Sequence, residues 1–475
     1  MESLSDKRCA RAAWIVVGLF IAFCLLTLDY NGPFFDEGIY ITAGVRNLEG
    51  YGASDQYLSW FAGSMLWPTL SALGYQVAGL PGARAVATLF TTGALVATML
   101  ATRNLFGRPA AFWTVLALAI SGPFLAMARL AVYDSSALAG IAVSFWAITM
   151  LERHNHRGWI LLAGLAYVFA LFSKYPSGLM LLPLVGLVVA LRRARASMDL
   201  AILGFVSLAV VLILYIPLRA PLSQLGTRLA PQEILRQPTA VTLSSVLYFG
   251  GLPIALAVPG WLLARDRRLV TTVLLAALLI WPAYHLRQAF VVSLSKHVVF
   301  GFVFGYPLIG LGLSIIWDRW RRHAAVVAVG VVLVMTGAVQ WQQLDHIWPD
   351  MRTAAQYLVA QVEPGDKLLI NDSWPYTLYL YTSGRIEKPQ DVIDIYSREE
   401  AGIGLCDYNW FVASDYTPRW PQEVLDALTR CGTFQPVFSA SSSVSMLNFT
   451  FDYVVAPVEI VVWQNGLQGT QNARY

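Results

Sequence analysis

The sequence predicts a polytopic α-helical membrane protein with about eleven spanning helices, within a range of 11–13, and a small C-terminal α/β domain. Two observations predict this class. Of the 475 residues, 57% are hydrophobic and only 13% are charged, whereas an ordinary soluble domain is about 25% charged. The apolar residues also form runs of about 16 to 22, which as helices can cross a hydrocarbon core of about 30 Å.

The first apolar run follows a basic N-terminal flank that contains Lys7, Arg8 and Arg11. This outline is that of a signal sequence, but no small-residue cleavage site follows the run. We therefore interpret the run as a retained first helix, which its basic flank orients with the N-terminus in the cytoplasm.

The apolar runs define a membrane domain over 1–343. They predict spanning helices over 14–29, 84–102, 110–128, 136–151, 159–174, 177–191, 200–217, 241–264, 269–284, 298–316 and 324–340. Starting from an inside N-terminus, this order makes every inside loop basic, as the positive-inside rule requires. The basic positions are Arg103, Arg108, Arg153, Arg157, Arg192, Arg193, Arg195, Arg265, Arg267, Arg268, Arg319, Arg321 and Arg322. The odd number of spans places the rest of the chain outside.

Between these helices, residues 30–83 form a long first outer loop, for which we expect a surface helix over 38–48. Two extra spans within this loop would keep the same topology. The outer segment 219–240 is predicted to be a loop that could border an anionic ligand, although an ordinary connecting loop explains its prolines better. Nucleic acid is a poor candidate partner, because the net charge of +4 comes from separate arginine clusters.

The composition of 344–475 is that of a soluble domain outside the membrane. We expect a helix over 350–362, buried strands over 367–370 and 410–413, and a helix over 421–429. Of the four cysteines, only Cys406 and Cys431 lie in this domain. They could form a disulfide, which would suit an oxidising compartment.

The ionisable residues that remain near helix ends all fall on the outer side. Burying a charge at membrane depth costs about 2.5–3.5 kcal/mol on insertion scales, so such charges are retained where they pair or act. For any one residue, reaching the interface or marking a loop end is an equally good explanation. Together they predict a shared site, formed from Asp29, Asp36, Glu37, Arg129, Asp134, Lys174, His285, Arg287, Lys296 and His297.

The adjacent acids Asp36 and Glu37 follow a turn-forming segment at the membrane face. One carboxylate could act as a general base on an acceptor hydroxyl while the other orients it. Alternatively, the two acids could cap the expected helix over 38–48. The outer cations could hold a phosphate and stabilise it as a leaving group; these are Arg129, Lys174, Arg287, Lys296 and His297.

No other catalytic signature competes with this cluster. The sequence contains no P-loop, no His-Glu-x-x-His motif and no Cys-x-x-Cys pair. A cytoplasmic sugar nucleotide could not readily reach a site on the outer face, whereas a lipid-borne phosphosugar could arrive through the bilayer. A metal is not required, because basic residues can neutralise the phosphate, although a divalent metal is not excluded.

Several segments, in order, resemble the membrane-embedded C-type fold (GT-C) glycosyltransferases, especially the protein O-mannosyltransferases and aminoarabinose transferases of glycosyltransferase family 39. FFDEGIYITAGVRNLEG is similar to the first outer loop of that family. RNLFGRPAAF, ARLAVYDSSALAG, ALFSKYPSGLMLLP and KHVVFGFVFGYPLIG resemble later family segments. The resemblance covers roughly residues 14–316.

The resemblance implies a GT-C fold and an inverting transfer from a polyprenyl- or dolichyl-phosphate sugar to a lipid, glycan or protein acceptor. It implies that Asp36 is the catalytic base and Glu37 its partner, and that Arg129, Lys174 and His297 face the donor phosphate. We expect Lys296 and Arg287 to assist there, and expect substrate contacts from Asp134, His285 and Tyr175.

A transporter or flippase for a lipid-linked or anionic substrate is the alternative function. Such a protein should contain internal repeats and midplane charges or broken helices, but no repeat is evident and the charges lie toward one face. We therefore favour a multi-pass glycosyltransferase, and expect it in a bacterial inner membrane or a plasma membrane.

Overall fold

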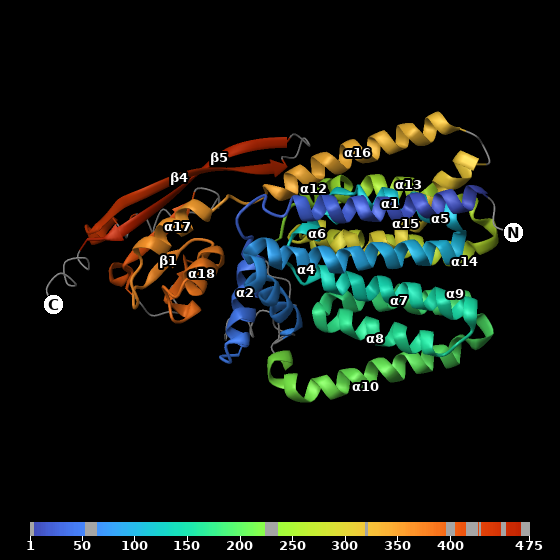
Figure 1. Ribbon diagram of the computed structural model, residues 1–475, viewed down its shortest axis with the longest axis horizontal. Helices are drawn as coiled ribbons and strands as arrows, with labels where there is room; N and C mark the ends of the chain where they lie inside the picture. The colour runs from blue at the N-terminus through green and yellow to red at the C-terminus, as the bar shows by residue number, and fades with distance from the viewer. Residues whose placement is uncertain are drawn as a thin grey trace.

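The computed structural model describes residues 4–52, 64–223, 236–318, 322–395, 404–414, 426, 429–447 and 453–466. It shows a bundle of long helices with a mixed α/β layer at one end (Figure 1). The N-terminus lies at the opposite end of the bundle from this layer (Figure 1). Most of the expected loop over 219–240 and of the expected helix over 421–429 falls outside the described residues.

Each predicted span falls on helical structure. The bundle helices are α1 (Leu4–Leu26), α4 (Leu66–Phe106), α5 (Arg108–Ala119), α6 (Gly122–Arg129), α7 (Asp134–His154), α8 (Gly158–Ser173), α9 (Leu181–Arg192), α10 (Ala196–Ser223), α12 (Thr239–Val246), α13 (Leu252–Leu263), α14 (Arg268–Gln288), α15 (Leu294–Asp318) and α16 (His323–Asp345). Within the described residues, eight helices are long and apolar enough to span a membrane, or nine if α5 and α6 count as one span. The number eleven therefore stays a prediction.

The predicted span over 110–128 is broken where a single straight helix was expected, and α4 differs from its predicted bounds. α5 and α6 meet at a bend of 67°, because Gly122 and Pro123 begin a new helix after Ser121. α4 extends N-terminally beyond the predicted 84–102 and is kinked at Ala78 and Gly79, where Gly79 has φ 61°. Residues 66–77, expected in the outer loop, are thus helical.

Close packing in the bundle relies on small residues, as is usual for membrane helices. A Cβ added to Gly310 of α15 would lie 2.4 Å from the Ala110 carbonyl oxygen of α5. A Cβ on Gly260 of α13 would lie 1.9 Å from the Leu308 oxygen of α15. These helices approach at a distance that a larger side chain would prevent.

The C-terminal layer is a five-stranded sheet with two helices. It contains α17 (Arg352–Gln361), β1 (Leu368–Ile370), α18 (Ser373–Thr382), β2 (Val392–Asp394), β3 (Trp410–Ser414), β4 (Phe434–Leu447) and β5 (Tyr453–Asn465). The strand order is β2-β1-β3-β5-β4. β1 pairs in parallel with β2 and β3, whereas β5 is antiparallel to β3 and β4. The α/β class is confirmed, and a disulfide joins Cys406 to Cys431 with a Cα–Cα distance of 5.6 Å.

α2 (Phe35–Leu48) connects this layer to the bundle. It is the surface helix expected over 38–48, extended by three residues at its N-terminus. Ile39 and Tyr40 of α2 share one apolar core with Trp374 and Leu378 of α18. The C-terminal layer therefore packs directly on the first outer loop.

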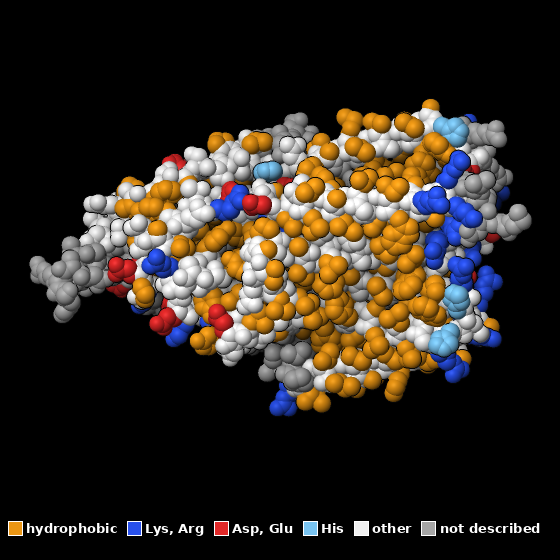
Figure 2. Space-filling model, viewed as in Figure 1, with side chains coloured by type: hydrophobic (Ala, Val, Ile, Leu, Met, Phe, Trp, Pro, Cys, Tyr) orange, Lys and Arg blue, Asp and Glu red, His pale blue; other side chains and the backbone are white. Residues whose placement is uncertain are grey.

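Charge is distributed unevenly along the long axis of the molecule. Lys and Arg side chains gather at the end of the bundle that is remote from the C-terminal layer, and apolar side chains cover the middle (Figure 2). This arrangement is the one that the positive-inside rule predicts for a spanning bundle. The side of the membrane that each end faces stays a prediction.

Candidate active site

Asp36 forms an ion pair with Lys296 at the end of the bundle that carries the C-terminal layer. Asp36 lies in the first turn of α2, and Lys296 lies in the first turn of α15. The Lys296 Nζ atom donates to Asp36 Oδ2 over 2.6 Å. The two side chains are 24% and 14% exposed, so the carboxylate is reachable from outside the protein.

A second carboxylate–lysine pair is more deeply buried. Lys174, at the junction of α8 and the short helix η1 (Tyr175–Met180), donates to Oδ1 of Asp134, the first residue of α7. Both side chains are buried. Asp134 Oδ2 is buried without a hydrogen-bond partner among the described residues. Because buried polar atoms are normally satisfied, this oxygen is suited to accept a hydrogen bond from a ligand.

The two ion pairs belong to one electrostatic cluster. Lys174 and Lys296 each interact electrostatically with Asp36 and Asp134, and with one another. The cluster joins α2, α7, the α8–η1 junction and α15, which are distant in the sequence. It thus brings together two carboxylates and two ammonium groups that the sequence assigned to a shared site.

Two tyrosines that the sequence reasoning did not select lie in the same cluster. The rings of Tyr40 and Tyr133 have centroids 4.8 Å apart, and their hydroxyl groups are hydrogen-bonded. Burial raises the pKa of both phenols, and the nearby carboxylates Asp36 and Asp134 act in the same direction. Both therefore remain neutral hydrogen-bonding groups. Their spacing was an available signal: Tyr40 follows Asp36 by one helical turn, and Tyr133 directly precedes Asp134.

His285 and His297 form a hydrogen-bonded pair beside the lysines. His285 Nδ1 lies 2.6 Å from the Phe290 carbonyl oxygen, and its Nε2 lies 2.9 Å from His297 Nδ1. A carbonyl only accepts, so His285 Nδ1 carries the proton. In the neutral pair, His297 Nδ1 must then donate to His285, which leaves His297 Nε2 as a hydrogen-bond acceptor. The Trp281 ring, 4.3 Å from the His297 ring between centroids, holds its orientation.

The structure places Glu37 away from Asp36. The Glu37 carboxylate is fully buried and accepts from Arg84 Nε and Nη2 at 2.9 and 2.8 Å. It also accepts the backbone N–H groups of Ala131 and Phe34, both at 2.8 Å. With four donors on its two oxygens, Glu37 is a structural anchor for the start of α2. Arg84 was not selected from the sequence, although an arginine that opens an apolar run was a usable signal.

Arg129 likewise lies behind the cluster. It forms a buried ion pair with Asp345 at the end of α16, with Arg129 Nη1 2.5 Å from Asp345 Oδ2. The guanidinium groups of Arg84 and Arg129 lie 4.3 and 4.4 Å from the ring centroid of Tyr30. These residues form a buried knot (Tyr30, Glu37, Arg84, Arg129 and Asp345). The sequence prediction of a phosphate contact for Arg129 has no support in this geometry.

The two remaining predicted site residues are Arg287 and Tyr175. Arg287 is exposed and has no ion-pair partner in the described part of the chain. The Tyr175 ring packs on Phe172, with centroids 6.1 Å apart. Within the described residues, no group of three His, Cys, Asp or Glu side chains is arranged to hold a metal ion.

The architecture defines the class of protein: the chain has the GT-C fold. It superposes on ArnT from Cupriavidus metallidurans bound to undecaprenyl phosphate with a TM-score of 0.61 and 16% identity, over 94% of this chain and 97% of that one. AglB from Archaeoglobus fulgidus, in complex with an inhibitory peptide and a dolichol-phosphate, superposes with a TM-score of 0.55 and 12% identity, over 96% of this chain and 75% of that one. Arabinofuranosyltransferase AftD from Mycobacteria superposes with a TM-score of 0.50 and 13% identity, over 98% of this chain and 42% of that one.

Part of the sequence is also similar to a known family. Residues 64–218 match the family described as dolichyl-phosphate-mannose-protein mannosyltransferase. No curated protein matches the sequence. The GT-C fold expected from the resemblance is confirmed.

Proposed function

We propose that this protein is a glycosyltransferase that moves a sugar from a polyprenyl-phosphate donor to an acceptor hydroxyl on the non-cytoplasmic side of the membrane. The observation that carries the proposal is the convergence of the Asp36–Lys296 and Asp134–Lys174 pairs at the end of the bundle opposite the basic end. The match over 64–218 and the fold support the same donor class.

In the proposed reaction, Asp36 takes the proton of the acceptor hydroxyl as the oxygen attacks the anomeric carbon of the sugar. The bond between this carbon and the phosphate oxygen breaks, and the phosphate leaves with the electron pair. Because attack and departure occur on opposite faces, the configuration inverts. The ammonium groups of Lys174 and Lys296 neutralise the charge that develops on the leaving phosphate.

Lys296 has a second role in the absence of substrate, because it holds the Asp36 carboxylate in place. A donor phosphate that attracts Lys296 would compete for this ion pair and release Asp36 to act as a base. The His297 Nε2 acceptor suits a sugar hydroxyl better than an unprotonated phosphate oxygen. We therefore assign His297 to the sugar instead of the phosphate. Asp134 is assigned to the sugar as well, because its buried Oδ2 has no hydrogen-bond partner among the described residues.

The lipid, glycan or protein nature of the acceptor stays open. A transporter or flippase has less support, because the polar cluster lies at one end of the bundle and not along a path between its ends.

The test is transfer of radiolabelled sugar from polyprenyl-phosphate donors to membrane acceptors by the purified protein. Asp36→Asn should lower the rate by about 10²–10⁴-fold, the usual contribution of a general base. Asp29→Asn is the matched control: Asp29 was expected in the shared site, but the structure leaves its side chain exposed and pairs it with Arg352, 2.7 Å away. Full activity of Asp36→Asn would overturn the base assignment, and absence of transfer from every polyprenyl-phosphate sugar would overturn the proposed function.

A further inference from the structure

A pocket lies at the basic end of the bundle, remote from the candidate active site. It has a volume of about 360 Å³ and is formed where the α7–α8 turn meets the α9–α10 turn. Its lining residues are Leu151, Asn155, Arg157, Arg192, Arg195, Met198 and Asp199. Three arginines against one aspartate give this pocket an excess of positive charge.

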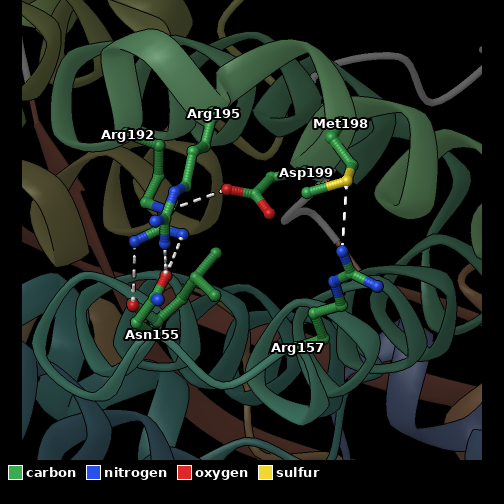
Figure 3. Close-up of a pocket in the computed structure, with 7 residues that line it drawn as sticks. Asn155, Arg157, Arg192, Arg195, Met198 and Asp199 are labelled. Atoms are coloured by element: carbon green, nitrogen blue, oxygen red, sulfur yellow. Dashed lines mark hydrogen bonds and ion pairs between the residues drawn. The ribbon is translucent and has the colours of Figure 1, made fainter.

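The pocket is built around Asn155, which ends α7 in the left-handed conformation with φ 50°. Its Oδ1 atom accepts from both Arg192 Nη2 and Arg195 Nη1, each over 2.6 Å (Figure 3). Two guanidinium groups are thus held against one neutral oxygen. Arg192 is anchored on its other side by Asp199, whose buried Oδ2 accepts from Nε over 2.8 Å.

The other two arginines lack a carboxylate partner among the described residues. Within the described residues, Arg157 donates only to the sulfur of Met198, over 3.3 Å (Figure 3), and thioether sulfur is a weak acceptor. In the part of the chain that the structure describes, the only hydrogen-bond partner of the Arg195 side chain is the Asn155 amide oxygen. Since a guanidinium group has five N–H donors, most of the donors of Arg157 and Arg195 are available to an anion. Arginine forks suit phosphate oxygens in particular.

The surroundings of the pocket indicate that the phosphate belongs to a lipid. Met198, in its wall, begins an exposed apolar stripe on α10 that continues through Phe205, Leu208 and Leu212. Their spacing of seven, three and four residues keeps them on one face of the helix. An acyl chain can therefore lie along α10 while its phosphate enters the pocket, an arrangement typical of basic pockets at the cytoplasmic ends of membrane helices.

We infer that this pocket binds the phosphodiester headgroup of an anionic phospholipid of the cytoplasmic leaflet. The site is independent of the proposed sugar transfer. A phosphodiester would neutralise the arginines that Asn155 holds together and would bridge the two turns.

The test titrates the full-length protein in detergent with dioleoylphosphatidylglycerol and measures the apparent Kd from the rise in Tm. Arg157→Gln/Arg195→Gln should weaken binding by about 30-fold, from the usual contribution of two basic residues near a membrane surface. Arg11→Gln/Arg265→Gln removes the same charge from exposed positions outside the pocket, and should change the Kd by less than about threefold. Arg192 is left intact, because its pair with the buried Asp199 is structural.

Two further arms decide the outcome. Inorganic phosphate and dioleoylphosphatidylcholine should not raise the Tm over the same range. Equal stabilisation by inorganic phosphate would overturn the lipid assignment, and an equal loss of affinity in both double variants would overturn the pocket as the site. If Arg157→Gln/Arg195→Gln unfolds, Arg157→Lys/Arg195→Lys replaces it. Retained phosphatidylglycerol binding with a Kd raised more than in the control supports the pocket. An unchanged Kd contradicts the proposed contact of the arginine forks with the phosphate.

Discussion

At the residue scale, Asp36 and Glu37 show how a helix separates adjacent side chains. Successive residues of a helix are about 100° apart around its axis, so the two carboxylates at the start of α2 face different partners. Asp36 meets Lys296 at a partly exposed site, whereas Glu37 is buried against Arg84. The sequence singled out the acidic pair as an unusual feature of the expected outer face, but it did not predict that the two acids have different partners.

The buried pair of Asp134 and Lys174 allows structural and functional roles to be separated. Lys174→Met should cost about 3–5 kcal/mol of stability, because it leaves a buried carboxylate without its cation. Lys174→Met/Asp134→Asn should recover most of this stability, since no charge is then buried alone. Sugar transfer should stay impaired in both variants. Recovery of transfer along with the Tm would show that Lys174 acts only through folding.

Asp372, between β1 and α18, gives the C-terminal layer a pH dependence. Burial, with a smaller contribution from Asp394, raises the pKa of Asp372 to about 7. An acid whose pKa is raised on folding favours the folded state only while it is protonated, so stability is lost as the pH rises from about 4 to 7. We expect a higher Tm at pH 5 than at pH 8, and a smaller difference in Asp372→Asn. The exposed Glu387→Gln serves as the control; an equal difference in both variants would contradict this assignment.

At the element scale, the contact of α2 with α18 links the C-terminal layer to the candidate base. A Cβ added to Gly38, two residues after Asp36, would lie 2.5 Å from the Trp374 carbonyl oxygen and 2.9 Å from the Pro375 nitrogen. Both obstacles are backbone atoms, so the two helices would have to separate. The position of Asp36 thus depends on how α18 packs.

Gly38→Ala should therefore destabilise the protein by about 1–3 kcal/mol, the usual cost of overpacking, and should lower sugar transfer further than the fraction unfolded explains. Gly93→Ala in α4 is the matched control, because nothing lies within 4 Å of its added Cβ. The measurements are Tm and initial rate on the same preparations. A Gly38→Ala variant that behaves like Gly93→Ala would remove α18 from the positioning of Asp36.

At the scale of the whole molecule, the buried knot and its neighbours tie the first outer loop to the end of the last span. The Asn31 amide nitrogen donates to the carbonyl oxygens of Asp345 and Trp348 over 3.1 and 3.0 Å. The ion pair of Arg129 with Asp345 crosses the same junction. The C-terminal layer is therefore held to the bundle on two sides, through α2 and through this junction.

Asn31→Ala should loosen this junction, because each buried carbonyl left without a donor costs about 1–3 kcal/mol. We expect amide hydrogen exchange over residues 345–352 to increase by about tenfold or more. Asn104→Ala removes a hydrogen bond of 2.9 Å to Thr149 in the bundle and should leave that exchange unchanged. Equal exchange in the two variants would show that Asn31 does not hold the junction.

The sequence by itself determined the membrane class, the approximate positions of most bundle helices and the basic end, and it predicted an outer position for Asp36. These are local properties, because hydropathy and charge act on each segment without reference to the others. It did not reveal the kinks in α4 and α5–α6, the helix α18, or the strands β4 and β5, whose form depends on packing partners.

Only the tertiary structure decided which cation meets which acid. Lys174 and Asp134 are 40 residues apart in the chain, and Lys296 and Asp36 are 260 apart. Their pairing requires helix termini from distant segments to meet, which close packing at glycines such as Gly38 and Gly310 permits. For the same reason Arg129, chosen for its charge, lies in the buried knot, and only the structure shows that Arg84 pairs with Glu37 and that Tyr133 contacts Tyr40.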